Sequence, residues 1–140
     1  MADYNLPMPT QQSPSGANFP YYYKHGELFG MHLESYGGDE VGVVAMLKAE
    51  TAFLLKQNCR MGAWINFYGT TLSDLVIDGL VEMITRIRPS VTKLALVGCG
   101  WLSRWKIRRR LAKTVGISGP PVRFFSDPEE AKTWLVSEGK

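Results

Sequence analysis

The stretch that decides the fold is KLALVGCGWLSRWKIRRR, residues 93–110. Its apolar run LALV (94–97) is typical of a strand that is buried on both faces of a sheet. GCG (98–100) follows, and two glycines allow a strand to turn sharply into a helix. The next segment, 101–115, has helical periodicity and carries six Lys or Arg within residues 104–113. We therefore expect a buried strand, a glycine turn and a basic helix, placed where open α/β sheets usually bind their ligands.

Strands and helices alternate on both sides of this stretch. Period-2 or continuous apolar runs predict strands, and apolar residues at spacings of three and four predict helices. The expected strands are 19–23, 28–35, 61–68, 94–97 and 122–125, and the expected helices begin at residues 40, 72, 101 and 128. This order predicts a single α/β domain with a mostly parallel central sheet of four to five strands and about four helices, joined by right-handed crossovers.

The length and composition fit one domain preceded by a tail. Residues 1–18 are rich in Pro, Gln and Ser and have no apolar period, so we expect a disordered tail there and the domain in residues 19–140. A net charge of +3 is too small to indicate nucleic acid as the partner. No run reaches the roughly 20 apolar residues of a membrane span, and the N-terminus does not resemble a secretory signal. Because Cys59 and Cys99 form no disulfide framework, we expect free thiols in a cytoplasmic protein without a transmembrane segment.

Two side chains in the predicted helices bear on how the core is built. Glu50 shares its side of the first helix with Met46 and Leu54. A buried carboxylate needs a partner, but long side chains often reach water from the rim of a core, so we expect Glu50 at the rim. In the last helix Trp134 shares a face with Leu135, which predicts that Trp134 anchors this helix to the sheet.

Three segments carry a resemblance to a known family. LALVGCGWLSRW (94–105) places a strand ending in Val-Gly before a helix that bears Trp. VRFFSDPEEAKTWL (122–135) places a strand of the Val-Arg-x-Phe type before Glu-Ala-x-x-Trp-Leu, and INFYG (65–69) fits the end of a middle strand. Over residues 27–137 the chain resembles the STAS-like superfamily of anti-sigma-factor antagonists, in its branch related to the CRAL-TRIO lipid-binding fold. The resemblance implies a STAS-like fold and a non-enzymatic regulatory domain that binds proteins in signalling, or alternatively a carrier or sensor of a small apolar or anionic ligand.

The resemblance also bears on Ser73. In the antagonist proteins of that superfamily, one serine of an Asp-Ser-Ser-Gly motif after the middle strand is phosphorylated by a partner kinase. Alignment of the strands places Ser73 near that serine, whereas Thr71 replaces the Asp and Asp74 replaces the Gly. Because the motif is absent, Ser73 is either a phosphoacceptor or simply a residue that starts a helix. A phosphate on Ser73 would be stabilised by the N-terminus of that helix.

No catalytic constellation is recognisable in the sequence. The two His residues have no Ser or Cys partner at the spacing of nucleophilic catalysis, and metal-ligand and P-loop motifs are absent. Gly98-Cys99-Gly100 begins like a dinucleotide fingerprint, but Ser103 stands at its third glycine. Cys99 precedes a helix, which can lower a thiol pKa, yet a packed and inert thiol is the better interpretation. We therefore expect no enzyme activity, no cofactor and no metal.

The basic helix is the main candidate for binding. Trp101 and Ile107 lie on its predicted apolar arc, and most of its Lys and Arg residues lie opposite, as in a surface helix that is docked by one side. Arg104 and Arg108 are different, because they project within the apolar arc beside Trp101 and Trp105. Guanidinium groups in such a place stack on indole rings or meet a carboxylate, a phosphate or a lipid head group.

The candidate site combines these two arginines with two loops. Loops 69–73 and 98–100 leave the carboxyl ends of neighbouring parallel strands, so we expect them side by side, each opening a helix whose free N–H groups favour an anion. The candidate site residues are Thr70, Thr71, Ser73, Gly98, Cys99, Gly100, Arg104 and Arg108. The expected partner is an acidic protein segment or a small anionic or apolar ligand. Nucleic acid is a weaker candidate, because the sequence contains neither a helix-turn-helix pattern nor an aromatic-basic strand surface.

Overall fold

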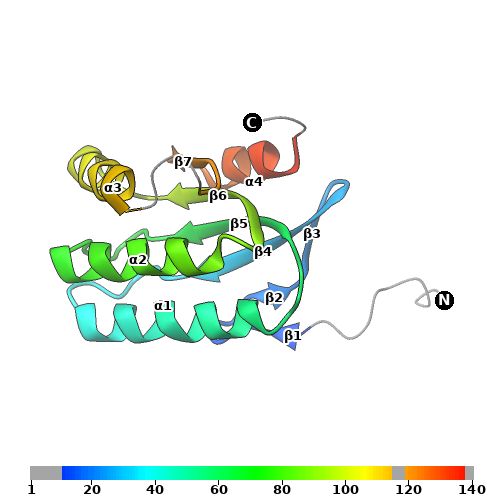
Figure 1. The fold of residues 1–140 in the computed structure, drawn as a ribbon, viewed down its shortest axis with the longest axis horizontal. Coiled ribbons are helices and arrows are strands. Elements are labelled where there is room, and N and C mark those ends of the chain that lie inside the picture. The colour runs from blue at the N-terminus through cyan, green and yellow to red at the C-terminus, as the bar shows by residue number, and fades with distance from the viewer. Residues whose placement is uncertain (1–10, 115–118, 138–140) are drawn as a thin grey trace.

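The decisive stretch forms strand β6 (Val91–Val97) and helix α3 (Trp101–Thr114) in the computed structural model, which describes residues 11–114 and 119–137 (Figure 1). β6 lies between β5 (Met61–Asn66) and β7 (Val122–Phe125). Within β6 every side chain except that of Thr92 is buried, as expected for a strand that is covered on both faces.

Five strands form the central sheet, in the order β3-β4-β5-β6-β7. Strands β4 (Gly26–His32) to β7 pair in parallel, and β3 (Tyr21–Tyr23) pairs antiparallel with β4. The helices are α1 (Glu40–Leu55), α2 (Asp74–Ile87), α3 and α4 (Pro128–Val136). The prediction of a single α/β domain with a mostly parallel sheet of four to five strands and about four helices is confirmed.

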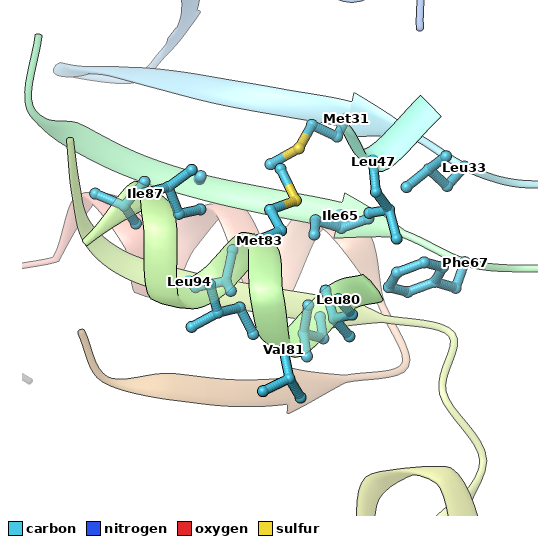
Figure 2. Packing of buried hydrophobic residues seen from close by; sticks show 14 of the residues in the cluster. Met31, Leu33, Leu47, Ile65, Phe67, Leu80, Val81, Met83, Ile87 and Leu94 are labelled. Atoms are coloured by element: carbon cyan, nitrogen blue, oxygen red, sulfur yellow. The ribbon is translucent and has the colours of Figure 1, made fainter. Parts of the chain in front are cut away.

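Each parallel strand is added beside the previous one, so the chain winds across the sheet in one direction. Right-handed crossovers place α1, α2 and α3 successively on one face, and α4 crosses the other face (Figure 1). On the first face the side chains fill the space between sheet and helices, as Figure 2 shows for Ile65 and Leu94 beside Leu80 and Met83. Within the described residues the sheet therefore lacks the reversal of strand order at which doubly wound folds bind their ligands.

A short hairpin precedes the central sheet. β1 (Gln11–Gln12) pairs with β2 (Asn18–Phe19). Phe19 is buried edge-to-face against Phe29 and Phe53, at ring-centroid distances of 5.4 and 5.3 Å. The expected disordered tail thus differs from the structure at residues 11–18, which belong to the fold, while residues 1–10 lie outside the described residues. Local sequence could not show this, because the hairpin is held by contacts to α1 and β4 rather than by its own apolar pattern.

Glu50 of α1 is fully buried beneath this hairpin, so the expectation that it reaches water at the rim of the core is wrong. Its Oε2 accepts hydrogen bonds from the Ser13 hydroxyl at 2.8 Å and from the Ser15 backbone N–H at 2.6 Å. Its Oε1 has no hydrogen-bond partner among the described residues. The carboxylate is therefore a polar attachment point for the hairpin inside an apolar core, where each lost donor is costly.

Helix α4 is fixed to the far face of the sheet at both of its ends. Asp127 caps its N-terminus by accepting a hydrogen bond from the Glu129 N–H at 3.0 Å. At its C-terminus the buried Lys93 ammonium donates to the carbonyl oxygens of Trp134 and Ser137, at 2.9 and 2.8 Å. Burial lowers the pKa of Lys93, and the positive charge of Arg123 lowers this pKa further. The lysine thus adds a charged donor to the end of the helix, where the Trp134 carbonyl oxygen also accepts from the Ser137 N–H and hydroxyl, at 3.1 and 2.6 Å.

The prediction that Trp134 anchors α4 is confirmed, since its side chain is 8% exposed and packs against Phe125. Trp134→Ala should lower the free energy of unfolding by about 3–5 kcal/mol, because a large buried ring is replaced by a cavity. Urea denaturation measures this change. Trp101→Ala is the matched control, since Trp101 is 81% exposed and its loss should cost less than about 0.5 kcal/mol. Equal effects of the two substitutions would contradict the assigned role of Trp134.

Ser13→Ala should loosen the N-terminal hairpin by removing one of the two donors to the buried Glu50 carboxylate. We expect a loss of about 1–3 kcal/mol of stability and faster amide hydrogen exchange in residues 11–19. Ser15→Ala serves as the control, because it keeps the backbone N–H that reaches Glu50 and loses instead an exposed hydrogen bond from the His32 N–H at 3.0 Å, so it should have the smaller effect. Identical exchange profiles for the two variants would show that the Ser13–Glu50 bond does not hold the hairpin.

Candidate interaction site on the basic helix

The loops that follow β5 and β6 lie side by side, as the sequence predicts. The Phe67 N–H donates to the Val97 carbonyl oxygen at 2.8 Å, which continues the pairing of the two strands into the loops. Gly98 has a φ of +85°, and a Cβ at this position would lie 2.9 Å from the backbone N of Tyr68. Gly98 is therefore required by a close approach of the two loops as well as by its backbone conformation. Gly100 has open space around it and is not required in this way.

Thr70 and Thr71 hold the loop after β5 against the loop after β4. The Thr70 hydroxyl donates to the Leu33 carbonyl oxygen at 2.5 Å and accepts from the Tyr36 N–H at 3.0 Å. The Thr71 N–H donates to the Gly37 carbonyl oxygen at 2.8 Å. The Thr70 hydroxyl and the Thr71 N–H are therefore already bonded within the fold and have a structural role, whereas Thr71 itself is exposed.

Ser73 caps the N-terminus of α2. Its hydroxyl accepts a hydrogen bond from the Val76 N–H at 3.3 Å and donates to Oε1 of Glu40 at 2.7 Å. Asp74 begins the helix directly after the cap. Two carboxylates thus surround the loop where an anion was expected, and a phosphate on Ser73 would lose the bond to Glu40 and be repelled. The contacts favour the interpretation of Ser73 as a helix-start residue.

Cys99 is buried between the glycine turn and α3. Burial raises the pKa of its thiol to about 12, although the charge of Arg104 opposes this shift. The thiol is therefore protonated near neutral pH and is a poor nucleophile. The Cys99 carbonyl oxygen accepts a hydrogen bond from Nε of Arg104 at 2.9 Å, so the turn and the first arginine of α3 are joined.

Arg104 and Arg108 point toward the edge of the sheet. Their guanidinium groups lie 5.6 and 4.7 Å from the ring centroid of Phe124 in β7, and they stack on this ring rather than on an indole. Neither arginine forms an ion pair with a carboxylate among the described residues. Two positive charges thus lie at the edge of the sheet without a carboxylate partner among the described residues.

The opposite side of α3 is paired with α2. Lys106 and Arg110 lie 3.5 and 3.6 Å from Oδ1 of Asp74, and Arg110 also contacts Asp78. These pairs are exposed, so each contributes only about 0–1 kcal/mol to stability. Their main consequence is the distribution of charge, because they neutralise one side of α3 and leave the other side cationic.

The outward side of α3 carries large exposed apolar side chains. Trp101 is 81% exposed, Trp105 is 52% exposed and Leu102 is 48% exposed. The prediction that Trp101 lies on the docked arc is wrong, and Ile107 is the buried residue that attaches this helix to the core. The Arg109 guanidinium lies 4.9 Å from the Trp105 ring centroid. We call Trp101, Leu102, Trp105, Arg108 and Arg109 the α3 face.

The spacing of the two Trp residues indicates this exposed surface. Treating all apolar residues of the helix as one arc hides that indication. Trp101 and Trp105 are one turn apart, and at 100° per residue both point more than a right angle away from Ile107. A helix with aromatic residues on the side opposite its buried residue has an apolar surface that the fold does not cover.

The residues described contain no group of three or more His, Cys, Asp or Glu arranged to hold a metal ion. No helix in the described segments has the length and apolarity needed to cross a membrane.

Cys99 is predicted to resist thiol reagents in the folded protein, because its thiol is buried and its pKa is raised to about 12. Cys59 is only partly buried, so Ellman's reagent at pH 8 should modify Cys59 first and Cys99 only after unfolding. In the unfolded chain the thiol of Cys99 ionises near its ordinary value of 9.0. The stabilisation linked to its folded-state pKa is therefore complete below pH 9 and is lost as the pH rises toward 12.

A Cys59→Ser variant isolates this behaviour. It should show no rapid reaction at pH 8, and its urea midpoint should fall more steeply above pH 9 than that of a Cys59→Ser/Cys99→Ala variant. Rapid modification of Cys99 under native conditions would contradict the assignment of an inert thiol.

Comparison of the chain with protein-family models, with curated proteins and with solved structures gives no match. The resemblance to the STAS-like superfamily accordingly stays a prediction. The structural feature that bears most directly on function is the exposed surface of α3.

Proposed function

We propose that this protein is a non-enzymatic regulatory domain of the STAS type that binds an acidic protein partner through the α3 face. The observation that carries the proposal is the exposure of Trp101 and Trp105 beside arginines that have no carboxylate partner among the described residues. Isolated exposed apolar residues are ordinary, but neighbouring aromatic residues on one helix face are typical of a binding surface.

The residue types on the α3 face suit a protein partner. Trp and Arg are enriched among the residues that dominate binding energy in protein interfaces, where the ring fills a pocket and the guanidinium meets a carboxylate. Arg109 already stacks on Trp105, so its planar group is oriented before a partner arrives. The positive charge that Arg104, Arg108 and Arg109 provide favours an acidic partner and would accelerate its association.

The packing of the core supports an interaction domain over a carrier. The side chains in Figure 2 fill the space between the sheet and the helices. A groove of about 170 Å³ lies between α1 and α2, and its walls include Lys48, Asp78, Glu82 and Arg86. Ligand sites are usually larger, about 300–1,000 Å³, and mostly apolar. Larger hollows of about 370–400 Å³ lie on the outer surface, but they are open to solvent, and charged side chains such as Asp74, Glu129 and Arg86 line them. Neither these hollows nor the packed core of the described residues offers the enclosed apolar cavity that a carrier needs.

The test is capture of the partner by chemical crosslinking and mass spectrometry, followed by measurement of Kd with the purified partner. Trp101→Ala/Trp105→Ala should weaken binding at least about 30-fold, because interface Trp residues each contribute about 2 kcal/mol or more. The matched control is Tyr22→Ala/Val41→Ala, which removes two exposed apolar side chains from other elements. Added salt should weaken the wild-type complex.

Two results would overturn the proposal. Equal yields of the same partners from wild-type protein and the double Trp variant would place the binding surface elsewhere. Trp-dependent cosedimentation with phosphatidylglycerol vesicles, without capture of a protein, would assign the α3 face to an anionic membrane surface, for which Trp and basic residues are also suited.

A further inference from the structure

We propose that the free edge of β7 accepts an extended acidic segment of the partner as an added strand. This inference rests on the proposed function, since it assumes a protein partner at the α3 face, and it adds a second contact with its own chemistry. Addition of a strand to a sheet edge supplies backbone hydrogen bonds for affinity, while side-chain contacts on the two faces of the sheet supply selectivity.

Among the described residues, the backbone of β7 has a partner strand on one side only. β7 is the last strand of the central sheet, and its inner side is hydrogen-bonded to β6 and the turn after it. The Leu94 N–H donates to the Pro121 carbonyl oxygen at 2.9 Å, and the Gly98 N–H donates to the Phe125 carbonyl oxygen at 3.1 Å. Backbone groups alternate in direction along a strand, so those of Val122 and Phe124 point away from β6. No described residue forms a backbone hydrogen bond with this outer side.

Positive charge borders the free edge on both faces of the sheet. On the α3 side, Arg104 and Arg108 stack over Phe124. On the α4 side, the exposed Arg123 lies 5.6 Å from the ring centroid of Phe125 and 5.3 Å from that of Trp134. The side chains of an added strand would alternate between these two faces, so carboxylates at either set of positions meet a guanidinium group.

The same charges select against pairing of β7 with a second copy of the chain. Two β7 edges side by side would bring Arg104, Arg108 and Arg123 of both copies together, which like charge disfavours. Pro120 and Pro121 precede the strand and carry no N–H, so the edge is short, as in folds that avoid self-association. Charge complementarity therefore identifies the occupant as a segment rich in Asp or Glu from another protein.

The test uses a defined probe, the capped octapeptide acetyl-EVEVEVEV-amide, which is extended and acidic. Titration into ¹⁵N-labelled protein should give saturable binding and should slow amide hydrogen exchange at Val122 and Phe124. Exchange at Arg123 and Phe125, whose amides face β6, should be unchanged and is the internal reference. The same peptide with N-methylated backbone amides keeps its charge but cannot donate, and acetyl-KVKVKVKV-amide reverses the charge. Neither control peptide should bind.

Charge reversal locates the contact on the protein. Arg108→Glu should weaken binding of the acidic peptide about tenfold, whereas Arg109→Glu, which is on the same helix but stacks on Trp105, should weaken it much less. The dispersed ¹⁵N spectrum of each variant verifies that it is folded.

The edge proposal is overturned if the acidic peptide does not bind at millimolar concentration, if the N-methylated peptide binds equally well, or if Val122 and Phe124 gain no protection. These outcomes differ from failure of the proposed function, because the peptide assay needs neither Trp101 nor Trp105. Loss of partner capture in the double Trp variant together with an inert β7 edge would leave the α3 face as the whole binding surface.

Discussion

The one-directional winding of the parallel strands determines most of what this fold presents to solvent. Since β4, β5, β6 and β7 follow one another across the sheet, α1, α2 and α3 must be laid down in the same order on one face. α1 and α2 share a long contact and bury their apolar sides together. α3 is the last of the three and has a helical neighbour on one side only. Apart from the side on which Ile107 reaches the core, its remaining sides face water and the outer edge of β7.

The ion pairs between α2 and α3 determine which side of α3 keeps a net positive charge. Asp74 and Asp78 neutralise Lys106 and Arg110 on the side where the helices meet. Within the part of the chain that the structure describes, Arg104 and Arg108 near the sheet edge and Arg109 on the outward surface form no ion pair with a carboxylate. The net charge of +3 hides this basic region, which the six Lys or Arg within residues 104–113 predict, and the fold determines which of these charges meet a carboxylate.

Structural features that depend on neighbouring residues in the sequence could be predicted. Features that depend on contacts between residues far apart in the sequence could not. The buried strand β6 and the start of α4 at Pro128 each depend on residues within a few positions, so local patterns identified them. The roles of Thr70 and Glu50 depend on partners more than 30 residues away, at Leu33 and Ser13. Periodicity places a residue on a side of its own helix, but it does not say which neighbour covers that side, and Trp101 was misplaced for this reason.

The N-terminal hairpin has a consequence for the order in which the chain acquires its structure. Residues 11–19 leave the ribosome before α1 does, but the carboxylate that accepts the hydrogen bond from Ser13 is 37 positions later. The hairpin cannot dock until α1 has been synthesised. Its docking closes a long loop, and the hydrogen bonds to Glu50 and the packing of the Phe19 ring must offset the chain entropy that is lost. The hairpin thus docks only after the later-synthesised helix that it covers, and until then Phe29 and Phe53 lack the Phe19 ring that packs against both of them.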